Sequence, residues 1–206
     1  MFSEYQERLR ERCLAAPVVP APEPWRPLPG PPAAPGVPGY AVGGLTGIGF
    51  AVHPTTGHDL VMVVSGAGHG LFDAVTGERL ARDRDPDPET DSPEDHPDLV
   101  CPGLGPIAGV PVRIAGLYGG GPHTGTSDGW SLDVVSPDWP HHRVLLSRGG
   151  GGLYREPAGR TWWHVFHSRH SELRTAGFSP SGDTLAVATS SDLTLWTRRP
   201  TPHART

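Results

Sequence analysis

The sequence predicts an all-β protein built from small antiparallel sheets, and three observations support this fold class. From residue 43 onward, short apolar runs alternate with turn residues. Glycine, with 28 residues in the chain, lies between such runs, where turns between strands require it. Groups of runs recur at roughly 40 to 50 residues, the period of small repeated sheets. We therefore expect a small or incomplete array of about three to four antiparallel units, with a β-sandwich as the alternative fold.

A short amphipathic helix is expected at residues 1–16, ahead of the strands. Ser3 and Gln6 have the spacing of a capping box, and Pro17 ends the helix. A helix of this length is marginal on its own in water, so its apolar stripe should dock on the same domain, or alternatively on a partner. The stripe consists of Phe2, Tyr5, Leu9, Cys13 and Ala16.

Residues 17–42 form a proline-rich segment that we interpret as a linker. Each proline fixes φ and removes a backbone donor, so the stretch 17–38 should be extended or polyproline II. Trp25 within it is expected to pack on the domain, because so large an apolar ring gains from burial. At the other end of the chain, residues 199–206 are expected to form a short tail.

The domain itself is expected to span residues 43–198 and to contain three sets of strands. Tight turns separate the runs, as in antiparallel meanders. The first set comprises residues 47–52, 59–65, 68–74 and 78–81, the second 109–117, 130–135 and 143–147, and the third 152–155, 161–167, 173–178, 184–188 and 193–197. An early strand near residues 40–44 is a candidate to complete the last set.

An acidic, proline-rich loop interrupts the domain at residues 83–98. It holds eight acidic residues against one arginine, whereas the rest of the chain is close to neutral. Its carboxylates follow the ligand spacing of a calcium-binding EF-hand loop, but Pro88 stands where that loop needs a glycine, and no helices are expected to flank it. We therefore interpret it as a solvated acidic loop, with calcium binding as the alternative.

The stretch of residues 176–196, AGFSPSGDTLAVATSSDLTLW, has the pattern of three strands separated by two turns. Phe178 and Leu185 are expected to point into the space between neighbouring sheets, Asp192 to accept turn amides, and Trp196 to pack the closing strand. In this order the stretch resembles a blade of the WD40 β-propellers. Residues 49–54 and 71–78 resemble a second, weaker copy, with Phe72-Asp73 where the family has its Trp-Asp pair.

The resemblance implies a short and irregular WD40-like propeller, because the family's Gly-His pair and its full Ser/Thr-His-Asp-Trp hydrogen-bond network are incomplete here. A closed propeller typically needs at least four blades, and the chain offers about three clear units. All 17 basic side chains are arginine, and the complete absence of lysine is typical of the GC-rich coding of actinobacteria. We therefore expect a bacterial protein.

Composition weighs against several function classes. The arginines form no basic stripe, which argues against nucleic acid as a partner. No apolar run approaches the roughly 18 residues needed to span a bilayer, and residues 1–16 lack a signal core, so we expect no membrane contact and a cytoplasmic location. Cys13 and Cys101 are expected to be free thiols.

No catalytic or cofactor motif stands out. The sequence contains neither a G-x-S-x-G nucleophile elbow nor a phosphate-binding P-loop. His164, His167 and His170 suggest a metal cluster by number, but on a regular strand the first two would point to opposite faces. We therefore expect no metal, no cofactor and no enzyme activity.

Rigid strands that carry variable loops favour a binding surface. We expect a non-enzymatic module, such as an immunity or regulatory protein, that binds another protein through one loop face. One alternative is a propeller enzyme or carbohydrate-binding domain that uses the same face. Another is a structural accessory subunit attached through residues 1–38. The candidate residues of the loop face are His123, Asp128, Trp130, His141 and His142.

Overall fold

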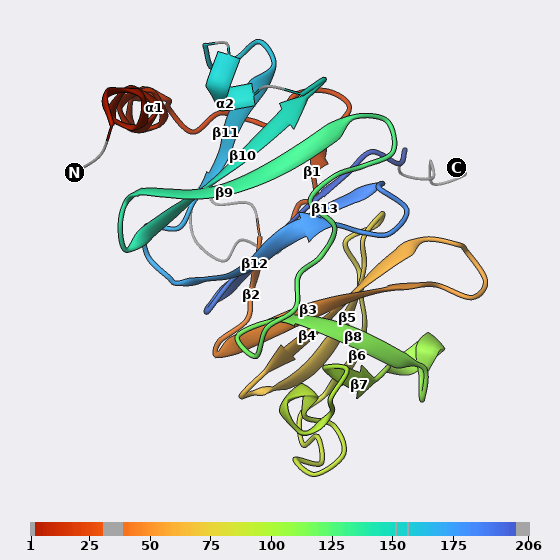
Figure 1. Cartoon of the computed structure of the whole chain (residues 1–206). Coiled ribbons are helices and arrows are strands. Elements are labelled where there is room, and N and C mark those ends of the chain that lie inside the picture. The colour runs from red at the N-terminus through yellow and green to blue at the C-terminus, as the bar shows by residue number, and fades with distance from the viewer. Residues whose placement is uncertain (1–2, 31–38, 151, 156, 201–206) are drawn as a thin grey trace.

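Three antiparallel sheets and an N-terminal helix are the main elements of the described part of the chain (Figure 1). The computed structural model describes residues 3–30, 39–150, 152–155 and 157–200. Strands account for most of its regular structure, so the predicted all-β class is confirmed. Phe2 and most of the expected tail lie outside the described residues.

The largest sheet has six strands in the order β6-β5-β4-β3-β8-β7. Its first four strands form the predicted meander, with apolar residues buried along β4 and β5. The assignment of β8 to a second set is wrong, because β8 pairs with β3 through Gly47, Ile48 and Gly49. The strands are β3 (Leu45–Val52), β4 (Asp59–Ser65), β5 (Gly68–Asp73), β6 (Arg79–Asp83), β7 (Val100–Pro102) and β8 (Pro111–Gly116).

A second sheet joins the two ends of the chain. Strands β12 (Leu173–Phe178), β13 (Thr184–Thr189) and β14 (Asp192–Thr197) form an antiparallel meander. Two early strands, β1 (Arg26–Pro27) and β2 (Tyr40–Ala41), pair with the free edge of β14. Tyr40 lies opposite Leu193, so the expected early strand near residues 40–44 does complete this set.

The third sheet consists of β9 (Trp130–Asp138), β10 (His141–Arg148) and β11 (Trp162–His167), with β10 in the centre. The strand expected at residues 152–155 is wrong, since Gly152–Arg155 forms the short helix α2. The hairpin expected between residues 152–155 and β11 therefore does not form, and β11 pairs with β10 instead. A β-bulge interrupts this pairing between Val144 and Leu145.

The three sheets stack face to face, with the β12–β14 sheet in the middle (Figure 1). Strand β14 explains why, because its alternate side chains point to opposite faces. Leu193 and Leu195 join a core shared with β3 and β4, whereas Trp196 joins a core shared with β9 and β10. Phe178 and Leu185 are fully buried in this second core, as expected of residues between sheets.

Asp192 does not accept the backbone amides of the turn, although this was expected of it. Its carboxylate accepts hydrogen bonds from the hydroxyls of Ser191 and Thr189. The turn amides are bonded instead by Thr189, whose Oγ1 accepts from the amides of Ser191 and Asp192 at 3.3 and 3.0 Å. A threonine at the end of β13 therefore caps this turn, and the prediction for Asp192 is wrong in its detail.

Helix α1 (Glu4–Ala15) covers the outer face of the β9–β11 sheet. Ser3 and Gln6 form the predicted capping box at its start. Cys13 and Ala16 pack with Leu145 and Trp162, which confirms docking of the helix on its own domain. On the opposite side of the molecule, β7, β8 and the short 3-10 helix Gly105–Ile107 cover β4.

The proline-rich segment, expected as a linker, packs against the sheets over residues 17–30. The Val19 amide donates to the His164 carbonyl, and the Leu28 amide donates to the Leu195 carbonyl, each at 2.9 Å. Trp25 is 2% exposed and stacks on Phe178 with ring centroids 5.4 Å apart. Trp25 and Leu28 therefore belong to the hydrophobic core, whereas only Trp25 was expected to pack there.

The acidic loop is organised by its own side chains. Asp91 accepts the Asp87 amide at 3.0 Å, and a one-turn 3-10 helix covers Pro93–Asp95. The Cys101 thiol donates to the Asp91 carbonyl at 3.0 Å, which ties the loop to β7. Across the described ranges, no helix combines the length and apolar character required to cross a bilayer.

Candidate functional site

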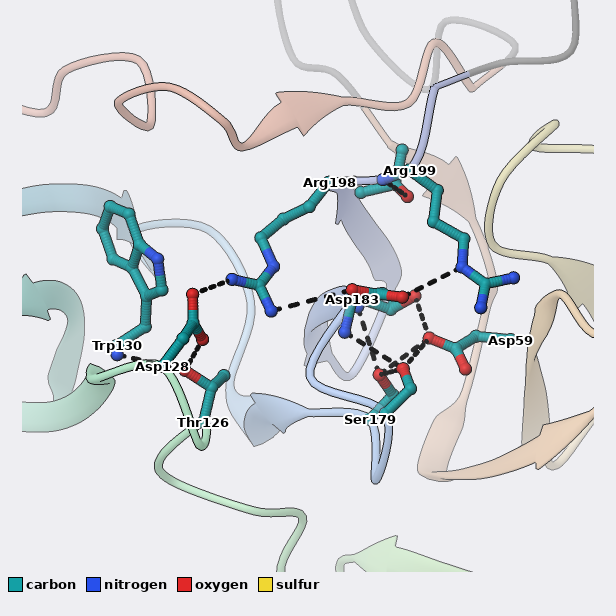
Figure 2. Close-up of polar contacts among 11 residues, drawn as sticks. Asp59, Thr126, Asp128, Trp130, Ser179, Asp183, Arg198 and Arg199 are labelled. Carbon is teal, nitrogen blue, oxygen red and sulfur yellow. Dashed lines mark hydrogen bonds and ion pairs between the residues drawn. The ribbon is translucent and has the colours of Figure 1, made fainter.

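A group of polar residues lies at one end of all three sheets, and we call it the polar seam (Figure 2). It includes Asp59, Asp128, Ser179, Asp183, Arg198 and Arg199. Asp59, the first residue of β4, is 3% exposed and lies against the β12–β13 turn. Its Oδ2 atom accepts hydrogen bonds from the hydroxyls of Ser179, Ser181 and Thr184 at 2.8, 2.7 and 2.8 Å. A buried carboxylate with three donors is satisfied without a cation, because hydroxyls replace the water it lost.

Two consecutive arginines extend this seam to the third sheet. Figure 2 shows Arg198 between Asp128 and Asp183. The nitrogen–oxygen distances of these two ion pairs are 2.5 and 3.7 Å. Arg199 contacts Asp183 from the other side at 2.9 Å and donates to the Gly57 carbonyl at 2.7 Å. The Arg198 guanidinium also lies 5.1 Å from the centre of the Trp25 ring. Each sheet thus contributes to one continuous set of polar contacts.

Asp128 and Trp130 lie together at this seam, as the sequence predicted, but they form no open face. Hydrogen bonds from Thr126 and Arg198 lower the pKa of the Asp128 carboxyl. Trp130 is 2% exposed, packs edge-on against Trp25 with centroids 5.9 Å apart, and donates its amide to the Thr126 hydroxyl. Trp130 is therefore a core residue, and its prediction as a binding residue at a surface is wrong.

Among the described residues, His123 makes its contact through the backbone. Its carbonyl accepts the Phe178 amide at 2.7 Å, which extends the edge of β12 by an isolated bridge. Its imidazole is exposed. In the seam, the serine hydroxyls donate to a carboxylate rather than to an imidazole, so the described residues provide no activated nucleophile there. The seam is best explained as a structural connection between sheets.

His141 and His142 lie far from the other predicted residues. Trp130 pairs with Arg148 at one end of the β9–β10 hairpin, and Asp138 pairs with His141 at its other end. Because a strand rises about 3.3 Å per residue, the length of β9 separates the two groups. The predicted loop face is therefore divided between two opposite ends of one sheet, a distribution that the sequence does not show.

The turn between β9 and β10 carries the most exposed large apolar side chain of the described residues. Trp139 and Pro140 form this two-residue turn, and Trp139 is 77% exposed. Its ring meets that of His142 edge to face, with centroids 5.8 Å apart. The His142 ring also hydrogen-bonds to the Ser136 hydroxyl at 2.7 Å. We refer to residues 138–142 as the hairpin tip.

Two grooves flank the hairpin tip. The first, the helix groove, has a volume of about 590 Å³ and runs between α1 and β9. Its walls are mainly apolar and include Leu9, Val135, Leu153, Tyr154 and Trp139. The second, the histidine groove, has a volume of about 410 Å³ and is lined by Trp139, Pro140, His141, His142, Arg169 and His170. Trp139 is common to both.

A buried polar cluster fixes the base of the hairpin tip. Arg143 contacts Asp138 at 3.1 Å and donates to the Cys13 carbonyl of α1 at 3.2 Å. Asp138 also lies 3.6 Å from Nε2 of His167. The hydrogen bond from Arg143 lowers the pKa of Asp138, the main cause of its shift. Burial lowers the pKa of His167 to about 4, and the positive charge of Arg143 contributes further.

His164 and His167 lie on the same side of their sheet, contrary to expectation. Their rings are 5.6 Å apart because the bulge in the β10–β11 pairing adds one residue between them. His164 is 1% exposed and shares a hydrogen bond with the Ala16 carbonyl at 2.9 Å, which anchors the end of α1. Burial lowers its pKa. In the part of the chain that is described, no three histidine, cysteine or acidic residues are arranged to hold a metal.

Trp139 was not among the predicted binding residues, but the sequence contains a signal for its exposure. Residues 137–140 read Pro-Asp-Trp-Pro between two apolar strands. Two prolines and an aspartate favour a turn, and a tryptophan within a tight turn has no sheet face on which to pack. An exposed aromatic ring follows from this arrangement.

Comparisons with protein-family models, curated proteins and solved structures give no match to this chain.

Proposed function

We propose that the protein is a non-enzymatic interaction module that binds another protein through its hairpin tip. The observation that carries the proposal is the 77% exposure of Trp139 on a two-residue turn. A tryptophan that contributes to folding gains its stability by burial, whereas this ring remains in water at an energetic cost. Aromatic side chains of this kind dominate the binding energy at protein interfaces.

The surroundings of Trp139 support the same proposal. The turn holds the ring without a flexible loop, and Ser168 fixes the following strand by accepting the His142 amide at 2.9 Å. A rigid anchor loses little conformational entropy when a partner binds. The adjoining grooves supply apolar and polar surface on either side of the ring, as an interface core and rim require.

For the architecture, we infer an irregular and incomplete WD40-like propeller in which each stacked sheet corresponds to a blade. Face-to-face packing of consecutive sheets supports this inference, as does completion of the β12–β14 sheet by an early strand. The pairing of β8 with β3 is a departure, because propeller blades are separate sheets. The array proposed for this chain is therefore less regular than the WD40 propellers that residues 176–196 resemble.

The two alternative functions receive less support from the geometry. An enzyme or carbohydrate-binding face would need His123, Asp128 and Trp130 to line one pocket, but Trp130 is buried and Asp128 is bonded to Arg198. An accessory subunit attached through residues 1–38 would need that segment free, but α1 and Trp25 pack on the domain.

The test is a comparative capture experiment with extracts of the native host. The wild-type protein and the Trp139→Ala and Val52→Ala variants would be immobilised in equal amounts. Val52 is 60% exposed on the β3–β4 hairpin and serves as a matched control. We expect proteins retained by the wild type and by the control to be lost from Trp139→Ala. Full retention by Trp139→Ala, with unchanged circular dichroism, would contradict the proposal.

A further inference from the structure

The charges around the hairpin tip indicate the chemistry of its partner. We propose that the tip binds an acidic protein segment that carries a large apolar side chain. This inference rests on the proposed function, since it specifies what the same surface takes. The apolar side chain enters the helix groove beside Trp139, and the acidic groups lie along the arginines and histidines at its edges.

The helix groove accounts for the apolar part of the partner. Leu9, Val135 and Leu153 form its base, and the exposed rings of Tyr154 and Trp139 stand at its sides. Its volume of about 590 Å³ lies within the roughly 300–1,000 Å³ that is typical of binding pockets. An aromatic or long aliphatic side chain therefore fits the groove and removes both its own apolar surface and that of the rings from water.

The acidic groups of the proposed partner are inferred from the charged residues that line the two grooves. Some of these residues have no partner of opposite charge within the described part of the chain. Each carboxylate that lines the two grooves already forms an ion pair, Asp138 with Arg143 at 3.1 Å and Glu172 with Arg174 at 3.0 Å. Arg10 and Arg169 line the same grooves and, within the described residues, make no ion pair with a carboxylate. The surface thus has an excess of positive charge next to an apolar groove, which complements a negative partner.

Hydrogen bonds hold both arginines at the surface. Arg10 donates from Nε to the Pro137 carbonyl at 2.8 Å, and Arg169 donates from Nε to Nδ1 of His167 at 3.0 Å. The terminal nitrogens of each guanidinium make no hydrogen bond within the described part of the chain, so they can receive a carboxylate. Because the Nε bonds fix the planar groups before binding, less rotational freedom is lost when an acidic group docks.

The orientation of α1 agrees with this charge distribution. The helix places Gln6, Leu9, Arg10 and Cys13 toward the groove. At about 100° per residue, its three glutamates fall outside the sector of the helix that faces the groove. These glutamates are Glu4, Glu7 and Glu11. The acidic side chains of the helix therefore do not neutralise the groove.

A selection of displayed random peptides tests the inference directly. Twelve-residue peptides would be selected on the wild-type protein and counter-selected on Trp139→Ala, which leaves only binders that need the tip. We expect enrichment of sequences that combine an aromatic or leucine anchor with several aspartates or glutamates. Binders that depend on Trp139 but lack acidic enrichment would overturn the inference and leave the proposed function standing. An absence of any Trp139-dependent binder would contradict both.

Synthetic copies of the selected peptides then allow a quantitative check. Of the six tryptophans, all of which are described, Trp139 is exposed and the other five are buried or partly buried, so protection from iodide quenching reports binding at the tip. We expect Arg10→Glu to weaken binding roughly tenfold by charge repulsion, and Arg113→Glu, on the exposed face of β8, to leave it unchanged. Equal affinity for Arg10→Glu and the wild type would overturn the acidic component.

Discussion

The hydroxyl of Thr184 donates a 2.8 Å hydrogen bond to Oδ2 of Asp59, and this bond joins the start of β13 to the start of β4 in the neighbouring sheet. Ser179 and Ser181 donate to the same oxygen atom. A single carboxylate therefore connects two layers of the fold at a point where both strands begin. Its removal is the most direct test of how the layers are held together.

We expect Asp59→Ala to lower the free energy of unfolding by about 3 kcal/mol, because it leaves buried hydroxyls without an acceptor. Urea denaturation followed by tryptophan fluorescence would measure the change. Ser181→Ala, which removes one donor at a more exposed position, should cost about 1 kcal/mol. A loss for Asp59→Ala no larger than that for Ser181→Ala would show that the carboxylate does not connect the sheets.

The ion pair between Arg198 and Asp128 should contribute much less. Asp128 has an exposed side chain, at 47%, so water and salt screen its charge. In a double-mutant cycle with Arg198→Met and Asp128→Asn, we expect a coupling energy below about 1 kcal/mol that decreases further at high salt. A larger, salt-independent coupling would mean that this part of the seam behaves as a buried pair.

Acid should destabilise the protein through the histidines beneath the hairpin tip. Burial lowers the folded-state pKa of His164, and that of His167 from 6.5 to about 4. The unfolded chain therefore binds more protons between these values, so stability is full above about pH 6.5 and falls as the pH drops toward 4. We expect a loss on the order of 2 kcal/mol, measured by urea denaturation at several pH values.

His167→Gln provides the matched control for this pH dependence. Glutamine cannot titrate, so the variant should lose less stability than the wild type between pH 6.5 and pH 4. The pKa values of Asp138 and Asp73 are lowered, so both carboxylates stay charged through this interval. Their contribution to stability is lost only at lower pH. Identical pH profiles for the variant and the wild type would assign the effect to other groups.

Truncation should separate the contributions of the helix and the proline-rich segment. A chain that begins at residue 17 loses α1 but keeps Trp25, and we expect it to fold with reduced stability. A chain that begins at residue 39 also loses the tryptophan that packs on Phe178 and Trp130, a change that alone costs about 3–5 kcal/mol. We expect it not to unfold cooperatively, and a sharp thermal transition would contradict this.

Both cysteines should be unreactive in the folded protein. Burial raises the pKa of Cys101 to about 12, with the Asp91 charge contributing, and burial also raises the pKa of Cys13. Because the thiolate is the reactive form, DTNB at pH 8 should label neither thiol before unfolding and both after it. Rapid labelling of one thiol in native buffer would indicate local opening of α1 or of the acidic loop.

The local pattern of the sequence predicts much of this fold. Strands 59–65 and 173–178 agree with the structure to the residue, because apolar runs with turns on either side leave few other choices. The pairing of strands could not be predicted in the same way, since nothing in residues 111–116 indicates that they pair with β3 rather than β9. Gly152–Arg155 is too short for periodicity to distinguish a helical turn from a strand.

The candidate site was predicted in part. His141 and His142 do lie at the exposed hairpin tip, but Trp130 is buried at the far end of the same hairpin. Sequence reasoning marks loops that carry aromatic residues, and it cannot decide which ring the neighbouring sheet will cover. The bulge that brings His164 toward His167 is likewise set by long-range pairing rather than by local sequence.

The pairing of β1 and β2 with β14 has a consequence for biosynthesis. Ribosomes add about 5–20 residues per second, so the first strands emerge many seconds before the strand on which they pair is complete. Trp25 and Tyr40 must remain without their native contacts during that time, exposed to chaperones or to other nascent chains. The middle sheet can therefore be completed only after β14 has been synthesised.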